Sequence, residues 1–244
     1  IAPLEAVDEL DVSYVSNISQ FGDPDVVIIP GSKNTISDLL WMRQNGLEGK
    51  ILRHAAKGGI VFGICGGYQM LGQSISDPMG TEQKGTVRGM GLLPVTTVFE
   101  QEKRRTRVSG RFAKVGGALA EMSGVCYEGY EIHMGRTVLS KEAVPLVYME
   151  EEGEQRQDGA QSDHVYGCYM HGIFDKSETV KTFLAAVLRK KGIDPSKITV
   201  RDRNAYKEEQ YDRLASIVRE NLNMEAVYKI IEKGNEASCS LLSE

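Results

Sequence analysis

The chain has 244 residues, of which 41% are hydrophobic and 26% charged, and its formal net charge is −5 at pH 7. This composition is ordinary for a soluble globular domain, and the negative charge argues against nucleic acid as a main partner. No apolar run reaches the ~20 residues that a membrane-spanning helix needs. We therefore expect no membrane partner and a cytoplasmic location.

The first third of the sequence alternates between strand-like and helix-like runs. A β-branched run at 25–30 predicts a buried strand, and apolar spacing at 36–46 and 47–57 predicts two helices. The run "IVFGI" at 60–64 predicts a second buried strand, and 66–74 a further helix. Strands and helices that alternate over short connections indicate an α/β fold built on a parallel sheet.

The middle of the chain changes character. Short β-like runs broken by glycine fill 85–147, and they predict an antiparallel β addition that completes or flanks the main sheet. The polar stretch at 151–159 is interpreted as a turn or flexible loop, and 164–175 as a strand with a turn. Amphipathic spacing predicts a helix at 177–192 and one or two helices at 203–234.

The four cysteines (Cys65, Cys126, Cys168 and Cys239) contain no CxxC pair. Their spacing suits neither a zinc site nor a disulfide framework, so we expect no metal site and a reducing compartment. A basic run at 103–107 predicts a solvated β-edge or loop, or alternatively a docking surface for an acidic partner.

The stretch "GIVFGICGGYQML" at 59–71 has the shape of a nucleophile elbow, with Cys65 where a strand turns into a helix. Gly63 and Gly67 would leave room where strand and helix approach each other closely. The helix N-terminus is expected to lower the pKa of the thiol from about 8.5 to roughly 3.5–7.5. The backbone N–H of Gly66 would point to a developing oxyanion. A small buried cysteine that fills space is the structural alternative.

A thiolate nucleophile needs a base, which is normally histidine. His171 is favoured because "YMHGIFD" places it where an apolar strand ends. His133, in "GYEIHMGR", is the competitor. His54 lies in a polar helix and is expected to be exposed, and His164 follows an acidic loop.

Four motifs occur in order along the chain: "PGSKNT" (30–35), "GICGGYQMLG" (63–72), "GYEIHMGRT" (129–137) and "GCYMHGIFD" (167–175). Together they resemble the glutamine amidotransferase domain of the cobyric acid synthases, over about 25–222. The resemblance implies a flavodoxin-like, mostly parallel sheet flanked by helices. We predict a single domain of this class over 1–234 and a flexible tail over 235–244.

The resemblance implies a class I glutaminase with L-glutamine as substrate. Cys65 would attack the side-chain amide, and His171 would protonate the leaving ammonia and then activate water to hydrolyse the thioester. The oxyanion would lie between backbone N–H groups of Gly31, Ser32 and Gly66.

Three further residues are candidates for substrate binding. Gln69 falls on the C-x-G-x-Q position that contacts glutamine in similar enzymes, and its (i, i+4) spacing puts it on the same helix face as Cys65. A merely solvated Gln69 is the alternative. The stretch at 129–137 is expected to line the glutamine pocket, with either His133 or Arg136 near the substrate; a plain β-ladder is the other interpretation.

The sequence departs from most class I glutaminases at the third catalytic position. Two residues after His171, where they carry glutamate, this chain has Ile173. The absence of glutamate at this position is compatible with a Cys–His dyad, as in similar synthases. It is also compatible with a third catalytic group supplied by Asp175 or Glu131. Asp175 also fits a helix N-cap, since Glu178 follows three residues later, and we favour the cap.

No G-x-x-x-x-G-K-[ST] motif occurs, so we expect no cofactor in this domain. The resemblance places ATP and Mg in an N-terminal synthetase domain, in cis or as a separate chain. That domain would bind the corrinoid acceptor, adenosylcobyrinic acid a,c-diamide. We interpret the chain as an excised or separately encoded C-terminal domain, with residues missing between Ala2 and Pro3.

Three alternatives remain open at this point. The chain could be a glutaminase for another acceptor, cobyrinic acid or a cell-wall precursor. It could be a cysteine peptidase or redox-sensing thiol protein of the same fold, or a non-catalytic docking module.

Overall fold

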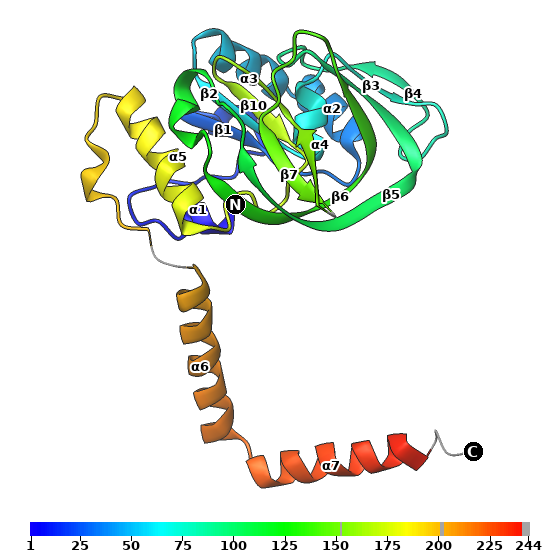
Figure 1. Cartoon of the computed structure of the whole chain (residues 1–244), viewed down its shortest axis with the longest axis vertical. Coiled ribbons are helices and arrows are strands. Elements are labelled where there is room, and N and C mark those ends of the chain that lie inside the picture. The colour runs from blue at the N-terminus through cyan, green and yellow to red at the C-terminus, as the bar shows by residue number, and fades with distance from the viewer. Residues whose placement is uncertain (152, 201–202, 241–244) are drawn as a thin grey trace. The chain divides into compact units, whose positions relative to one another are not determined.

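The computed structural model describes residues 1–151, 153–200 and 203–240. It divides into two compact units, Ile1–Val200 and Arg201–Glu244. The first unit holds two sheets and the helices around them, and the second holds two helices (Figure 1).

A parallel sheet forms the centre of the first unit. Strands β1 (Val26–Ile29), β2 (Ile60–Ile64) and β10 (Val165–Cys168) are parallel and lie in the order β1-β2-β10. A short strand, β9 (Ala160–Ser162), pairs antiparallel with β10. All five residues of β2 are buried, which explains why this central strand is a continuous apolar run.

Helices connect and cover the parallel strands. Four helices lie before the second sheet in the sequence: α1 (Ala2–Glu5), α2 (Thr35–Gln44), α3 (Leu47–Ala56) and α4 (Gly66–Leu71). Helix α5 (Ser177–Lys190) follows β10. These bounds confirm the predicted alternation, and the α/β fold class is confirmed with it. Helix α4 ends three residues earlier than predicted, because the chain goes on into a strand of the second sheet.

The second sheet has the order β4-β3-β5-β7-β8, and β6 also pairs with β5. Its strands are β3 (Ser74–Asp77), β4 (Gly85–Arg88), β5 (Val95–Phe112), β6 (Cys126–Leu139), β7 (Val147–Glu151) and β8 (Glu154–Asp158). It is antiparallel except for the parallel pair β3–β5. The predicted antiparallel addition is therefore present, but the short runs merge into two long strands, β5 and β6.

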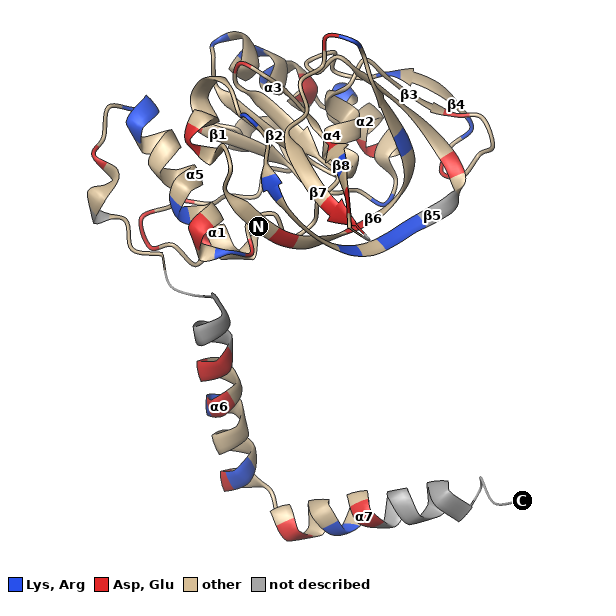
Figure 2. Ribbon diagram, in the orientation of Figure 1, with Lys and Arg blue, Asp and Glu red and all other residues tan. Residues whose placement is uncertain are grey.

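Two predictions in this region need correction. The polar stretch at 151–159 is not a flexible loop, because β8 lies within it and pairs with β7. The basic run lies in β5, as Figure 2 shows, and Arg105 and Arg107 are exposed as predicted. Arg104 differs, because it forms ion pairs with Glu131 and Glu151. The side chain of Lys103 lies outside the described residues.

The second unit consists of α6 (Arg203–Asn221) and α7 (Met224–Ser240), which confirms the prediction of one or two helices. The apolar residues Met224, Val227, Tyr228 and Ile231 follow the spacing of one helix face. Residues 241–244 of the predicted tail lie outside the described residues, and the domain boundary at residue 234 stays a prediction. Within the described part of the chain, no helix has the length and hydropathy needed to cross a membrane.

Two glycines allow α4 to pack directly onto the parallel strands. A Cβ atom on Gly63 would lie 2.7 Å from the backbone nitrogen of Tyr68, and one on Gly67 would lie 2.0 Å from the carbonyl oxygen of Ile29. Side chains cannot occupy either position without moving the backbone. The predicted close approach of strand and helix is thus confirmed.

We expect Gly67→Val to lower the free energy of unfolding by at least the ~1–3 kcal/mol typical of overpacking, because the clash is with backbone rather than a flexible side chain. Urea unfolding followed by circular dichroism would measure this. Gly49→Val in α3 is a matched control, since a Cβ atom there meets nothing within 4 Å. A Gly67→Val variant as stable as the wild type would contradict the close-approach argument.

Candidate active site

Cys65 occupies a strained backbone position between β2 and α4. Its φ and ψ are 53° and −109°, and it is the one non-glycine residue with positive φ in the described part of the chain. Such a conformation costs roughly 1–3 kcal/mol and persists only when the surroundings impose it. The backbone N–H donates to the carbonyl of Cys168 (2.9 Å), and the carbonyl accepts from the N–H of Gln69 (3.1 Å).

The thiol of Cys65 is buried, with 6% of the residue exposed. Its Sγ donates to the carbonyl oxygen of Ile132 at 3.5 Å. Burial raises the pKa of the thiol to about 11, although the backbone N–H of Gly66 acts in the opposite direction. The expectation of a pKa of 3.5–7.5 is therefore wrong for this state. Helix α4 has only six residues, and desolvation outweighs what its N-terminus supplies.

His171 follows β10 and is held by β6 on one side. Its backbone exchanges two hydrogen bonds with Tyr130, of 2.9 and 3.1 Å. The two rings stack with centroids 5.1 Å apart and an interplanar angle of 5°. Burial, and then the neighbouring His133, lower the pKa of His171. The neutral imidazole, which can accept a proton, is therefore favoured.

The predicted nucleophile and base meet at Gly31. A Cβ atom on Gly31 would lie 2.9 Å from Cε1 of His171 and 3.6 Å from Cβ of Cys65. A Cβ atom on Gly66 would lie 2.8 Å from the backbone nitrogen of Ser32. The structure thus brings together all five residues predicted for catalysis and the oxyanion.

The side chain of Ser32 fixes the loop that carries these backbone groups. Its hydroxyl donates to Asp38 Oδ2 at 2.5 Å and accepts from the backbone N–H of Asn34 at 3.0 Å. The loop "GSKNT" is therefore anchored to the first turns of α2 before substrate arrives.

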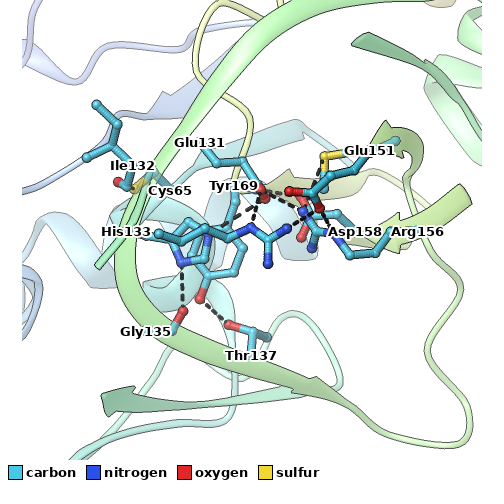
Figure 3. Close-up of polar contacts among 12 residues, drawn as sticks. Cys65, Glu131, Ile132, His133, Gly135, Thr137, Glu151, Arg156, Asp158 and Tyr169 are labelled. Atoms are coloured by element: carbon cyan, nitrogen blue, oxygen red, sulfur yellow. Dashed lines mark hydrogen bonds and ion pairs between the residues drawn. The ribbon is translucent and has the colours of Figure 1, made fainter. Parts of the chain in front are cut away.

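Gln69 is 2% exposed, so the solvated alternative is wrong. Its Nε2 donates to the hydroxyl of Tyr169 at 3.1 Å. That hydroxyl lies 2.5 Å from Oγ1 of Thr137 (Figure 3). A Cβ atom on Gly135 would lie 2.3 Å from Gln69 Nε2, so a side chain there would displace the carboxamide from its present position. Tyr169 was not predicted; its only signal is its place after a buried strand.

Glu131 and His133 form a second group of polar side chains, beside Tyr169 (Figure 3). Glu131 lies 3.6 Å from His133, and its Oε2 accepts from Arg104 (2.9 Å) and Arg156 (2.6 Å). Glu131 is therefore next to His133 and not next to His171, the residue that a third catalytic group would orient. No sequence pattern identified the two arginines as partners of Glu131, because they lie on β5 and β8, far from Glu131 in the sequence.

Arg136 and Asp175 are the remaining candidates. Arg136 is exposed, with its side chain 3.9 Å from Glu100, and this position gives no support to a role in substrate binding. Helix α5 begins after Lys176, which is its N-cap residue, so the favoured assignment of Asp175 as N-cap is wrong. A Cβ atom on Gly172 would lie 3.1 Å from Oδ2 of Asp175.

Two other expectations concern His54 and metal binding. His54 is buried rather than exposed, and its Nε2 donates to the carbonyl of Ile60 at 3.1 Å. Burial lowers its pKa. Among the residues that the structure describes, no group of three or more His, Cys, Asp or Glu side chains is arranged to hold a metal ion.

Comparison with solved structures identifies the fold. A crystal structure of a glutamine amidotransferase superposes with a TM-score of 0.52 at 16% identity, covering 75% of this chain and 88% of that one. The structure of PurLQS from Thermotoga maritima superposes with a TM-score of 0.53 at 18% identity, covering 73% of this chain and 85% of that one.

Comparison with curated sequences gives closer relatives. The cobyric acid synthase of Ruminiclostridium cellulolyticum is 50% identical over 237 residues, which cover 96% of this chain and 46% of that protein. That of Lachnoclostridium phytofermentans is 42% identical over 241 residues, covering 95% and 47%. The chain thus spans about half the length of the curated relatives it matches.

The sequence model of the CobB/CobQ-like glutamine amidotransferase domain matches residues 1–179, which include Cys65 and His171. This match extends over more than half of the chain and contains every residue of the site described above. The chain belongs to the CobB/CobQ-like glutamine amidotransferase domain family.

Proposed function

We propose that this chain is the glutaminase domain of a cobyric acid synthase, and that it hydrolyses glutamine through a thioester on Cys65. The observation that carries the proposal is the meeting of Cys65 and His171 at Gly31. Relatives of about twice the length, named cobyric acid synthase, support the choice of reaction.

The first half of the reaction forms the thioester. The resting thiol is neutral, because burial raises its pKa to about 11, so its proton must leave as the sulfur attacks. His171, kept neutral by its lowered pKa, accepts that proton and passes it to the departing ammonia. The oxyanion of the tetrahedral intermediate accepts hydrogen bonds from the backbone N–H groups of Gly31, Ser32 and Gly66.

The second half releases glutamate. His171 takes a proton from water, the hydroxide attacks the thioester carbonyl, and the sulfur leaves and regains a proton. The same backbone N–H groups stabilise the second oxyanion. No third side chain is required in this scheme, and the stacked Tyr130 and the backbone bonds of His171 hold the imidazole in place.

The ammonia would serve a partner domain. In this proposal an N-terminal synthetase domain, in cis or as a separate chain, binds ATP and Mg and activates carboxylates of adenosylcobyrinic acid a,c-diamide. This chain would itself need no cofactor. The assignment of a corrinoid as acceptor rests on the relatives alone, because it uses no residue of this chain.

Covalent labelling tests the proposed function directly. We expect diazo-oxo-norleucine, an electrophilic glutamine mimic, to add once to each chain at Cys65, and excess glutamine to block the addition. Intact and peptide mass spectrometry would record it, and Cys65→Ser is the control because it replaces a single atom. Labelling that glutamine does not affect would contradict the proposal.

The reactivity of the resting thiol should follow its raised pKa. We expect alkylation of Cys65 by iodoacetamide without glutamine to accelerate about tenfold per pH unit, with a midpoint near pH 11. Peptide mass spectrometry separates this signal from that of Cys126, which is an exposed thiol. A plateau below pH 8 would show an activated resting thiolate and refute the assignment of a neutral thiol.

Removal of the base should affect turnover more than folding. We expect His171→Ala to slow glutamine hydrolysis, measured as glutamate release, by the ~10²–10⁴-fold usual for a general acid–base. The thermal midpoint should change little, because the ring is half-buried and stacks on the exposed Tyr130. A loss of less than tenfold would exclude His171 as the base.

A further inference from the structure

Glu131 is a buried carboxylate, and only one of its two oxygens contacts the arginines. The residue is 0% exposed, and both arginine contacts, from Arg104 and Arg156, go to Oε2. Oε1 faces Nε2 of His133 at 3.6 Å, longer than a hydrogen bond, and neither atom has a hydrogen-bond partner among the described residues. Burial raises the pKa of Glu131, but His133 and Arg156 outweigh it and lower the pKa to about 2. Oε1 therefore belongs to a carboxylate and can only accept.

Both ring nitrogens of His133 face acceptors. Nδ1 lies 2.8 Å from the carbonyl oxygen of Gly135, which accepts and never donates, so Nδ1 must carry a hydrogen. A neutral ring would then direct a lone pair from Nε2 towards the carboxylate of Glu131. Only the doubly protonated ring offers a hydrogen in both directions. With a hydrogen on Nε2, a small shift of the side chains would shorten the 3.6 Å contact to a charge-assisted hydrogen bond.

The His133 ring is also the contact through which this pair reaches the active site. It stacks on the ring of Tyr169, with centroids 3.7 Å apart and an interplanar angle of 17°. A cation over an aromatic face is attracted by the ring quadrupole. The hydroxyl of Tyr169 in turn receives the Nε2–H of Gln69, one helical turn from the nucleophile.

We propose that Glu131 and His133 form an ion pair of carboxylate and imidazolium that positions Tyr169 and Gln69, and so sets the affinity of the site for glutamine. The role in affinity rests on the proposed function, whereas the charged state of the pair does not. Glu131 and His133 are positioning residues in this proposal, since they act through Tyr169 and transfer no proton. His171 keeps the acid–base role.

The charged groups around the pair come from four strands. Arg104 lies on β5, Glu151 on β7, and Arg156 and Asp158 on β8, while Glu131 and His133 share β6. Glu151 contacts both arginines but not His133. It therefore provides a matched control for the loss of a carboxylate from the same group of charges.

The first experiment measures the ring nitrogens of His133 by ¹⁵N NMR on the 244-residue wild-type chain, with His133→Gln to assign the signals. At pH 7.5 we expect both nitrogens at the chemical shift of a protonated ring. His54 is the internal control: it is also buried, but with its pKa lowered, so it should give the shifts of a neutral ring. A neutral tautomer of His133 at pH 7.5 would overturn the charged pair.

The second experiment compares Glu131→Gln with Glu151→Gln in labelling by diazo-oxo-norleucine. For Glu131→Gln we expect the glutamine concentration that protects half of Cys65 to rise about tenfold, and the labelling rate at saturating reagent to change less than threefold. Glu151→Gln should leave both values, and the ring shifts of His133, unchanged. Equal effects of the two variants would mean that the carboxylates merely stabilise the sheet, which would overturn the positioning role.

Tyr169→Phe tests the same chain of contacts without removing a buried charge, should Glu131→Gln fail to fold. It retains the stacking but loses the hydroxyl that receives Gln69, so we expect the half-protecting glutamine concentration to rise at least fivefold. Unchanged protection would contradict the positioning role. A wild-type chain that glutamine does not protect would overturn the proposed function, and the role in affinity with it. The ring shifts would still decide whether the pair is charged.

Discussion

The site depends on the pairing of β2 with β10. The ladder of these two parallel strands does not stop at the last residue of β2, because the N–H of Cys65 donates to the carbonyl of Cys168. Cys65, the proposed nucleophile, is therefore both the last member of a ladder and the residue before a helix. Since His171, the proposed base, follows Cys168 by three residues, the same hydrogen bond also fixes where His171 leaves the sheet. Loss of this register would separate the two side chains that meet at Gly31.

Burial of this centre sets its resting chemistry. Desolvation favours the uncharged form of each group, raising the pKa of the thiol and lowering that of the imidazole. A thiolate–imidazolium pair is thus not the stable state of the free site. In the proposed mechanism, charge develops only during attack, when the backbone N–H groups near Gly31 and Gly66 have an oxyanion to stabilise. Such a site protects its thiol from indiscriminate electrophiles while no substrate is bound.

The sequence predicted those features that depend on local spacing. The elbow could be predicted because glycine, cysteine and apolar residues follow one another there, and the close approach at Gly67 is a steric consequence of that order. The sign of the thiol pKa shift could not, because it depends on how deeply other segments bury Cys65. The prediction that His54 is exposed was wrong for the same reason. The sequence of a polar helix does not indicate that its histidine faces Ile60. Tyr169 was missed because no local pattern separates it from core aromatics.

The partners of Glu131 depend on register between strands, which no local pattern encodes. The pairing of β5 with β6 shifts between Phe99 and Arg104, after which Arg104 lies opposite His133. A pair of opposite residues shares a face, and Glu131, two residues away on β6, is the diagonal neighbour of Arg104 on that face. A slip of one residue would turn Arg104 to the other face of the sheet. Glu131 would then lose Arg104 and keep Arg156 and the contact with His133, with one cation fewer for a fully buried carboxylate. The irregularity in β5 therefore supplies one of the cations that stabilise this buried charge, in keeping with the tendency of bulges to re-aim side chains near functional sites.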